Sequence, residues 1–296
     1  MEMDMNFFQK SIFGIAVLAL AIGFGSCAST AKNEPAAKIG VNDAPHEVGD
    51  IVFYDGSATP YSEDLVLTDE QKNAAIAVIF HVGTECSNDD KTRILGLGLV
   101  QHEKGIAFAT SEANVVGTSK NGLHYLRRIS EISCDEKKMI FLEDADKDGS
   151  DNLSQIGAFL KDNNLFDDTS NSARYPAFYF AKNYAKLKKS HVQNKTFAKG
   201  WYLPTYCEYF TIWKNREIVN AALRLCGGTE FDMREHETSS AGKKTHKYRT
   251  SSTSDMNGGI PWLFASGHGT NIYDATAESV MFGGQIIFYA CAIRAF

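Results

Sequence analysis

The sequence predicts an α+β fold with helices in the middle of the chain and strands towards both ends. Short runs rich in β-branched residues, bounded by glycines, occur between residues 49 and 109 and again from residue 248 onward. Apolar residues at helical spacing recur between residues 152 and 225. Hydrophobic residues make up 44% of the 296 positions, so the chain has enough apolar surface to bury a core.

In the first half of the chain the sequence predicts four strands and one helix. The strands are expected at residues 49–56, 75–82, 94–100 and 105–109. Thr68 stands three residues before Gln71, which is the spacing of a capping box and predicts the start of a brief helix. Gly96 and Gly98 lie inside the third strand, and glycines there indicate a bulge or a close approach to the backbone.

In the second half, helices precede strands. The helices are expected at residues 152–161, 175–188, 205–215 and 217–225, and the last of them stops at a Gly-Gly pair. The strands are expected at residues 248–253, 261–266, 279–282 and 286–295. The final segment, IIFYACAIRA, is the strongest β pattern in the chain.

The charge balance excludes several classes of protein. Lys and Arg total 30 while Asp and Glu total 36, which gives a net charge of −6. A mildly acidic chain lacks the basic surface that nucleic-acid binding requires, so no nucleic-acid partner is expected. The composition also excludes fibrous, collagenous and polytopic membrane proteins. It does not distinguish an enzyme from a binding protein.

Residues 1–27 have the pattern of a lipoprotein signal peptide. Lys10 precedes an apolar run at residues 11–24, which has the length of a signal-peptide core and is slightly short for a bilayer span. The tetrapeptide Phe-Gly-Ser-Cys that ends at Cys27 resembles a bacterial lipobox, although its phenylalanine replaces the usual leucine-type residue. This resemblance implies cleavage before Cys27 and attachment of acyl chains such as palmitate, which anchor a protein stably. A plain secretory signal and a single N-terminal anchor helix are the alternatives.

Two further regions follow the signal. Residues 28–47 are rich in Ala, Lys, Asn, Pro and Asp without a period, which is typical of a flexible tether. Residues 48–296 are expected to form a single domain. The lipid anchor would hold this domain at the membrane of the cell envelope, with the outer membrane as the expected location and the surface and periplasmic faces both open.

The cysteines leave their pairing open. Five remain beyond Cys27, and an odd number leaves at least one unpaired. Cys207 and Cys226 flank a helical stretch and could approach one another, but buried, reduced thiols are the favoured interpretation. No C-x-x-C pair occurs, which argues against a zinc ribbon.

An acidic turn offers a possible calcium site. Asp144, Asp146 and Asp148 alternate as in the first half of an EF-hand loop, and a glycine follows them. The twelfth position is Gln155, which cannot supply the bidentate carboxylate. The alternative is an acidic turn that caps the helix beginning at Asn152. No other cofactor is expected.

Several segments together resemble a C-type-lectin-like domain: GWYLPT at 200–205, GG at 227–228, YRTSS at 248–252 and ACAIRAF at 290–296. The subclass is that of lipoproteins similar to the formylglycine-generating enzyme (sulfatase-modifying factor). Closer still are treponemal lipoproteins that include the variable protein of a diversity-generating retroelement. The resemblance covers about residues 48–296, and further matches lie at residues 49–83, 148–152 and 175–178. It implies paired terminal strands, central helices, long ligand-facing loops and a scaffold in which Trp201 belongs to the core.

The resemblance also implies a binding face between residues 249 and 285. Arg249 replaces the family's tryptophan and Thr250 its serine, which suggests a paralogue. The expected ligand-binding residues are Arg249, Asp255, Asn257, Trp262, His268, Asn271 and Tyr273. Aromatic anchors beside short polar residues resemble a paratope. For Trp262 and Tyr273 the alternative is ordinary packing in the core.

The sequence therefore favours a non-catalytic surface protein, such as an adhesin, that recognises an extracellular or envelope protein or a glycan. No catalytic residues are expected, because nucleophile elbows, phosphate loops and zinc-protease motifs are all absent. The alternative is a formylglycine-generating-type oxidoreductase acting on cysteine. That chemistry needs two nearby cysteines close to the C-terminus, and only Cys291 is there. A structural envelope protein without a soluble ligand is a third possibility.

Overall fold

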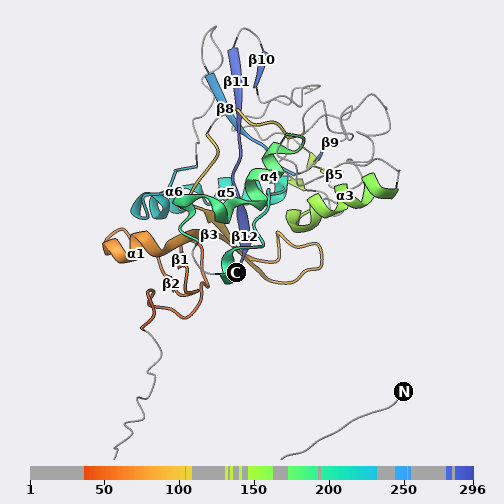
Figure 1. The fold of residues 1–296 in the computed structure, drawn as a ribbon. Helices are drawn as coiled ribbons and strands as arrows, with labels where there is room; N and C mark the ends of the chain where they lie inside the picture. The colour runs from red at the N-terminus through yellow and green to blue at the C-terminus, as the bar shows by residue number, and fades with distance from the viewer. Residues whose placement is uncertain are drawn as a thin grey trace, which may run out of the picture. The chain divides into compact units, whose positions relative to one another are not determined.

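The main sheet has five strands, and every neighbouring pair in it is antiparallel (Figure 1). The strands are β1 (Ile51–Phe53), β2 (Ala58–Thr59), β3 (Ala75–Gly83), β4 (Arg93–Gly98) and β12 (Ile293–Ala295). Their order is β12-β4-β3-β1-β2, which leaves the sheet open at both edges. With helices packed on it, this sheet confirms the predicted α+β class.

From Lys38 onward the described residues form one compact unit. The computed structural model describes residues 37–103, 105–108, 131–132, 134–135, 140–141, 146–162, 173–192, 195–231, 244–251, 253–254, 278–281 and 284–296. Within these ranges no helix combines the length and the apolar character that a bilayer crossing requires.

The first and last strands share this sheet but are not neighbours, so the predicted pairing of the terminal strands is wrong. β12 pairs with β4, where Ile293 stands opposite Leu97, and β1 lies between β2 and β3. The β1–β2 hairpin occupies one side of β1 and β3 occupies the other, so no free edge of β1 remains for β12. β3 pairs with one edge of β4, and the C-terminal strand β12 pairs with its other edge.

Residues 38–47 are hydrogen-bonded to the domain, so the part of the chain able to act as a tether is shorter than residues 28–47. Asn42 and Ala58 exchange two backbone hydrogen bonds, at 2.9 and 3.0 Å. The N–H groups of Ile39 and Gly40 donate to the side chains of Asp55 and Ser57, at 3.0 and 2.7 Å.

Local sequence signals explain α1 (Asp69–Ala74) and the glycines of β4. Thr68 and Gln71 form the predicted capping box, with each side chain accepting from the other's backbone N–H at 3.1 and 3.0 Å. Gly98 lies against the ring of Tyr184, and a Cβ atom on Gly96 would meet the ring of Phe296 at 2.6 Å. The predicted close approach to these glycines is confirmed.

Two separate buried clusters pack against the main sheet, and β3 is buried along most of its length. α5 (Tyr206–Lys214) and α6 (Arg216–Leu225) share one buried cluster with Val78 and Phe80 of β3. α4 (Pro176–Lys182) shares the other cluster with Ile79, Trp201 and Leu203. The continuous apolar run of β3 follows from this burial on two sides.

The predicted helix at residues 175–188 is shorter in the structure. α4 ends at Lys182, and two 3₁₀ turns follow, η2 (Tyr184–Lys186) and η3 (Lys188–Ser190). Asn183 caps the end of α4 with φ −101° and ψ 14°, and its backbone N–H and side-chain amide both donate to the carbonyl of Tyr179 at 3.0 Å. The remaining helical elements are η1 (Gly149–Asp151), α3 (Asn152–Asp162) and η4 (Lys195–Phe197).

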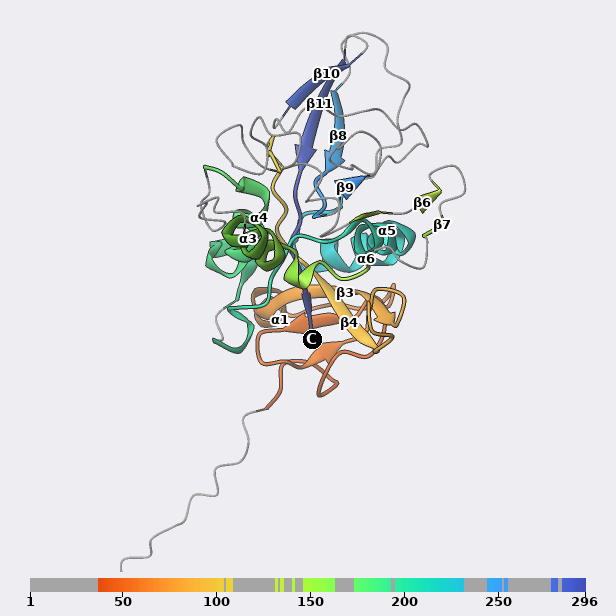
Figure 2. The same ribbon diagram turned by 90° about the vertical axis from the view of Figure 1, so that its right-hand side faces the viewer.

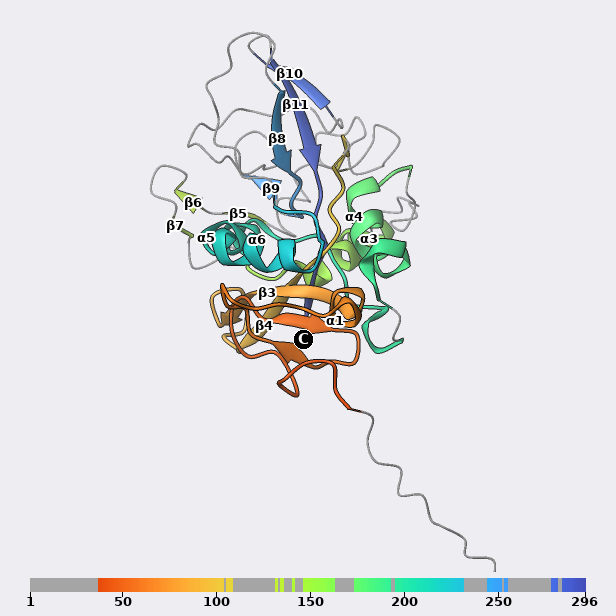
Figure 3. The ribbon, with the colours of Figure 1, turned by 90° about the vertical axis from the view of Figure 1, so that its left-hand side faces the viewer.

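The other strands lie on the side of α5 and α6 that faces away from the main sheet (Figures 2 and 3). β8 (Lys244–Tyr248), β10 (Glu278–Met281) and β11 (Gly284–Tyr289) form a sheet in the order β10-β11-β8, with β8 and β11 parallel. β5 (Glu131–Ile132) pairs with β9 (Thr253–Ser254), and β6 (Cys134–Asp135) pairs with β7 (Ile140–Phe141).

The predicted strand at residues 286–295 is two strands in the structure. β11 belongs to the three-stranded sheet and ends at Tyr289, and β12 begins in the main sheet at Ile293. Between them Ala290 exchanges two backbone hydrogen bonds with His102, at 2.8 and 3.2 Å, which turns the chain from one sheet to the other. Residues 105–108 are not a strand, and the strand predicted at 261–266 lies outside the described residues.

Candidate functional site

The predicted binding face begins with residues 248–251, here called the β8–β9 segment, and this segment is fixed to three other parts of the domain. The N–H of Arg249 donates to the carbonyl of Tyr289 at 2.8 Å, and the N–H of Ser251 donates to the carbonyl of Pro204 at 2.7 Å. The side-chain amide of Asn152 donates to the hydroxyl of residue 251 at 2.9 Å. Because these partners belong to β11, the loop before α5 and the start of α3, the segment is held firmly.

Arg249 itself is buried, which corrects the expectation that its side chain lies on an exposed binding face. Its exposed fraction is 0%, and its Nε donates to the carbonyl of Ile106 at 3.2 Å. The charge of Arg249 suggested a surface residue, whereas the structure uses the guanidinium inside the domain.

Tyr248 fixes the start of the same segment through an aromatic cluster. Its ring centroid lies 4.4 Å from that of Phe231, 5.5 Å from Tyr209 and 5.7 Å from Tyr289. Its hydroxyl donates to the side-chain oxygen of Gln101. Aromatic contacts of this kind add to the stability that burial of the rings provides.

A charged network lies beneath this segment, between the main sheet and α5. Arg93 of β4 contacts Glu208 Oε1 at 3.1 Å through NH1, and Asp148 Oδ1 and the Tyr202 hydroxyl at 2.9 Å through NH2. The Tyr202 hydroxyl donates to Glu208 Oε1 at 2.6 Å, and the N–H of Thr205 donates to Glu208 Oε2 at 2.8 Å. Glu208 is fully buried, so these donors replace all of its water.

Burial raises the pKa of Glu208 to about 7, against the effect of Arg93 and of the hydrogen bonds, which lower it. The pKa of Arg93 is raised although burial lowers it, because Tyr202, Glu208 and Asp148 favour the cation. Arg93 keeps some exposure to water and stays a cation. Glu208 has no exposure, so its negative charge depends on the neighbouring Arg93.

In the acidic turn, the carboxylates of Asp146 and Asp148 accept hydrogen bonds from donors of the protein itself. Asp146 accepts from the side-chain amides of Asn88 and Asn152, at 2.9 and 3.0 Å, and from the N–H of Asp148 at 3.2 Å. Asp148 pairs with Arg93 and caps η1. In the described ranges no three His, Cys, Asp or Glu side chains are placed to hold a metal ion. These contacts of Asp146 and Asp148 organise the start of α3.

The other predicted site residues lie outside the described part of the structure. They are Cys27, Asp144, Asp255, Asn257, Trp262, His268, Asn271 and Tyr273. The last six fall between the end of β9 and the start of β10.

The described cysteine side chains are all buried, and none forms a disulfide in the structure: Cys86, Cys207, Cys226 and Cys291. Burial raises the pKa of Cys226 to about 12 and raises that of Cys291 strongly. A buried thiol with a raised pKa supplies little thiolate at neutral pH, which argues against Cys291 as a redox nucleophile.

Sequence reasoning missed the charged network, although one signal was present. Thr205 and Glu208 have capping-box spacing, and the structure forms this box. The pattern could have identified Glu208 as a helix-capping residue. It carries no information about Arg93, which comes from a distant strand, or about the hydroxyl of Tyr202.

No protein-family model matches this chain, and no curated protein matches it. Among solved structures, a fimbrial protein from Bacteroides ovatus is similar at a TM-score of 0.46 and 15% sequence identity. The match covers 85% of this chain and 49% of that chain, so this chain spans about half of that protein's length. At this distance the similarity assigns neither a fold family nor a function.

Proposed function

We propose that this chain is an exported, lipid-anchored recognition protein with a C-type-lectin-like domain that binds a protein or glycan at the cell envelope without transforming it. The proposed contacts are Asp255, Asn257, Trp262, His268, Asn271 and Tyr273. Arg249 is not among them because it is buried.

The observation that carries this proposal is the anchoring of the β8–β9 segment. The contact residues follow β9 directly, and the chain before them is tied to Tyr289, Pro204 and Asn152. After them the chain returns through β10, which pairs with β11. Recognition residues are often carried by segments whose two ends are held by paired strands, which is how this segment begins and ends.

We expect alanine substitution at Asp255, Asn257, His268, Asn271 and Tyr273 together to weaken binding at least tenfold, because paratope-like surfaces concentrate affinity in few residues. The full chain, purified in detergent, would be applied to a panel of purified extracellular-matrix proteins and to a glycan array. Trp262→Ala would be made separately, since its alternative role is core packing.

The matched control replaces five exposed residues around α1: Glu63, Asp64, Glu70, Lys72 and Asn73. This region belongs to the main-sheet side of the domain (Figure 1). Both variants should keep the thermal midpoint of the unsubstituted protein. Unchanged binding by the loop variant would contradict the proposal. Copper binding with oxygen-dependent oxidation of a cysteine peptide, lost in Cys291→Ser, would favour the oxidoreductase instead.

For the lipid anchor, we expect Cys27→Ala to abolish incorporation of labelled palmitate in a bacterial host. The labelled, acylated form of the protein should then be missing from the membrane fraction. Acylation requires the thiol of Cys27, and two or more acyl chains are needed for stable anchoring. Cys226→Ala, at a buried cysteine, is the control and should keep the label. Palmitate labelling that persists in Cys27→Ala would exclude this anchor.

A further inference from the structure

Cys86 and Cys207 are far apart in sequence and adjacent in the fold. Cys86 follows β3 in the loop to β4, and Cys207 lies in the first turn of α5. Cys86 Sγ is 3.3 Å from the hydroxyl of Thr211, which donates to the carbonyl of Cys207 at 3.0 Å. Cys207 Sγ is 3.4 Å from the carbonyl of Glu85, the residue before Cys86. Cys207 Sγ therefore lies beside the backbone that precedes Cys86, and the hydroxyl of Thr211 connects Cys86 Sγ to the carbonyl of Cys207.

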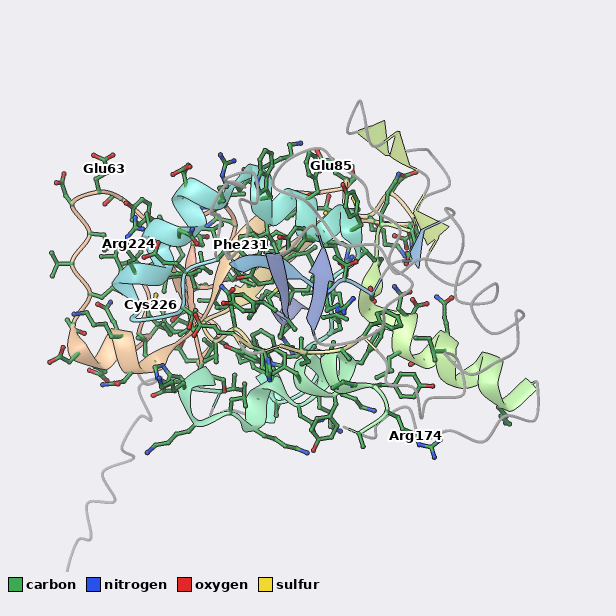
Figure 4. All side chains as sticks on the ribbon, turned by 90° about the horizontal axis from the view of Figure 1, so that it is seen from above. Glu63, Glu85, Arg174, Arg224, Cys226 and Phe231 are labelled. Atoms are coloured by element: carbon green, nitrogen blue, oxygen red, sulfur yellow. The ribbon has the colours of Figure 1, made fainter. Side chains whose placement is uncertain are left out.

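The direction of the pKa shift at Cys86 agrees with this placement. A hydrogen bond with Cys207 is the largest cause of the raised pKa of Cys86, followed by burial. Cys226 is differently placed, since Glu85 and Cys226 lie well apart along the α5–α6 pair (Figure 4). The sequence suggested that Cys207 could lie close to Cys226, whereas in the structure Cys207 lies close to Cys86.

We propose that Cys86 and Cys207 become joined by a disulfide when the protein folds in an oxidising compartment. One thiolate attacks the disulfide of an oxidant, either a protein disulfide oxidant or oxidised glutathione, and forms a mixed disulfide while releasing one thiol of the oxidant. The second cysteine then displaces the other. The two cysteines lose two protons and two electrons, and the oxidant's disulfide is reduced to two thiols.

Burial sets the time at which this bond forms. Cys86 is 0% exposed and Cys207 is 4% exposed, so an oxidant cannot reach them once α5 has docked. Exchange must therefore take place during folding, while both thiols are still open to solvent. The inference depends on the proposed export for its oxidant, but it is independent of ligand recognition.

The bond would lock one side of the charged network. Arg93 NH1 donates to the carbonyl of Cys86 at 2.6 Å, and Glu208 directly follows Cys207. A covalent link between these two cysteines would hold Arg93 and Glu208 in register across the gap between the β3–β4 loop and α5. It would also close a long loop, and a long loop gains most from cross-linking in the chain-entropy account.

The test uses the full chain in detergent, reduced and unfolded, then refolded with a mixture of reduced and oxidised glutathione. Free thiols are alkylated, and the digested protein is mapped by mass spectrometry without reduction. We expect a cross-linked peptide pair containing Cys86 and Cys207, together with a higher urea midpoint than that of the reduced protein. Cys86→Ser and Cys207→Ser should each lose this difference between oxidised and reduced forms, whereas the control Cys226→Ser should keep it.

Full alkylation of Cys86 and Cys207 after oxidative refolding would overturn the proposal, as would a Cys207–Cys226 cross-link. The peptide map of the unsubstituted chain distinguishes these outcomes even if a serine variant fails to fold. Loss of ligand binding by the loop variant has no bearing on the map, so a failure of the disulfide and a failure of the recognition role are distinguishable.

Discussion

Arg93→Met is expected to lower the free energy of unfolding by about 3–5 kcal/mol, the usual cost of removing one partner from a buried ion pair. The substitution leaves Glu208 fully buried without its cation and removes donors from Asp148, Tyr202 and the carbonyl of Cys86. Urea unfolding followed by tryptophan fluorescence and by circular dichroism would measure it.

The pH dependence of this loss has a defined sign. The folded-state pKa of Glu208, about 7, lies above its ordinary value of 4.5, so the folded state binds the proton more tightly. Stability from this group therefore falls as pH rises from 4.5 through 7. Without Arg93 the carboxyl should hold its proton to still higher pH. The difference between Arg93→Met and the unsubstituted protein should accordingly shrink as pH falls from 8 to 5.

Lys91→Met is the matched control for Arg93→Met. Lys91 contacts Asp89 at 2.5 Å, but the two side chains are 80% and 57% exposed, and solvent screens such pairs. We expect no measurable loss of stability. If Arg93→Met were as mild as this control, the network would not have the energetic role assigned to it.

Gly98→Val is expected to cost about 3 kcal/mol, at the upper end of the range for overpacked cores. Any Cβ at this position meets the ring of Tyr184, and the hydroxyl of that ring would lie 2.7 Å away. Tyr184 has little room to move, because its ring packs on Trp201 at 4.2 Å between centroids and its hydroxyl accepts the N–H of Val100 at 3.1 Å. Chemical denaturation gives the size of the loss.

A double-mutant cycle separates this steric cause from a general weakness of β4. Tyr184→Ala removes the side chain that the new methyl groups would strike, so Gly98→Val should cost much less in that background. Additive losses in the double variant would show that Tyr184 is not the obstacle.

Elements with local signals could be predicted from the sequence, and those that depend on distant partners could not. The capping residues Thr68 and Thr205 and the apolar run of β3 define their elements through neighbouring residues alone. The break between β11 and β12 lies where Ala290 forms backbone hydrogen bonds with His102. His102 is distant in sequence, so no local pattern predicts this break. The predicted pairing of the first and last strands is wrong because β1 already pairs with β2 and β3, which leaves β12 to pair with β4.

The candidate site divides in the same way. The resemblance predicted a binding face that begins at Arg249, but the side chain of Arg249 is buried. Its burial follows from contacts with Ile106 and Tyr289, which are remote in sequence. The proximity of Cys86 and Cys207 also required the fold, since no sequence pattern connects the two positions.

The attachment of the β8–β9 segment at three points bears on how such a protein could change over generations. Hydrogen bonds to Tyr289, Pro204 and Asn152 keep the domain's stability in residues that precede the proposed contacts. In the proposed recognition role, substitutions at those contacts are expected to change the bound partner without removing any of these three hydrogen bonds. A lineage could explore new binding partners on this frame without first acquiring compensating mutations elsewhere.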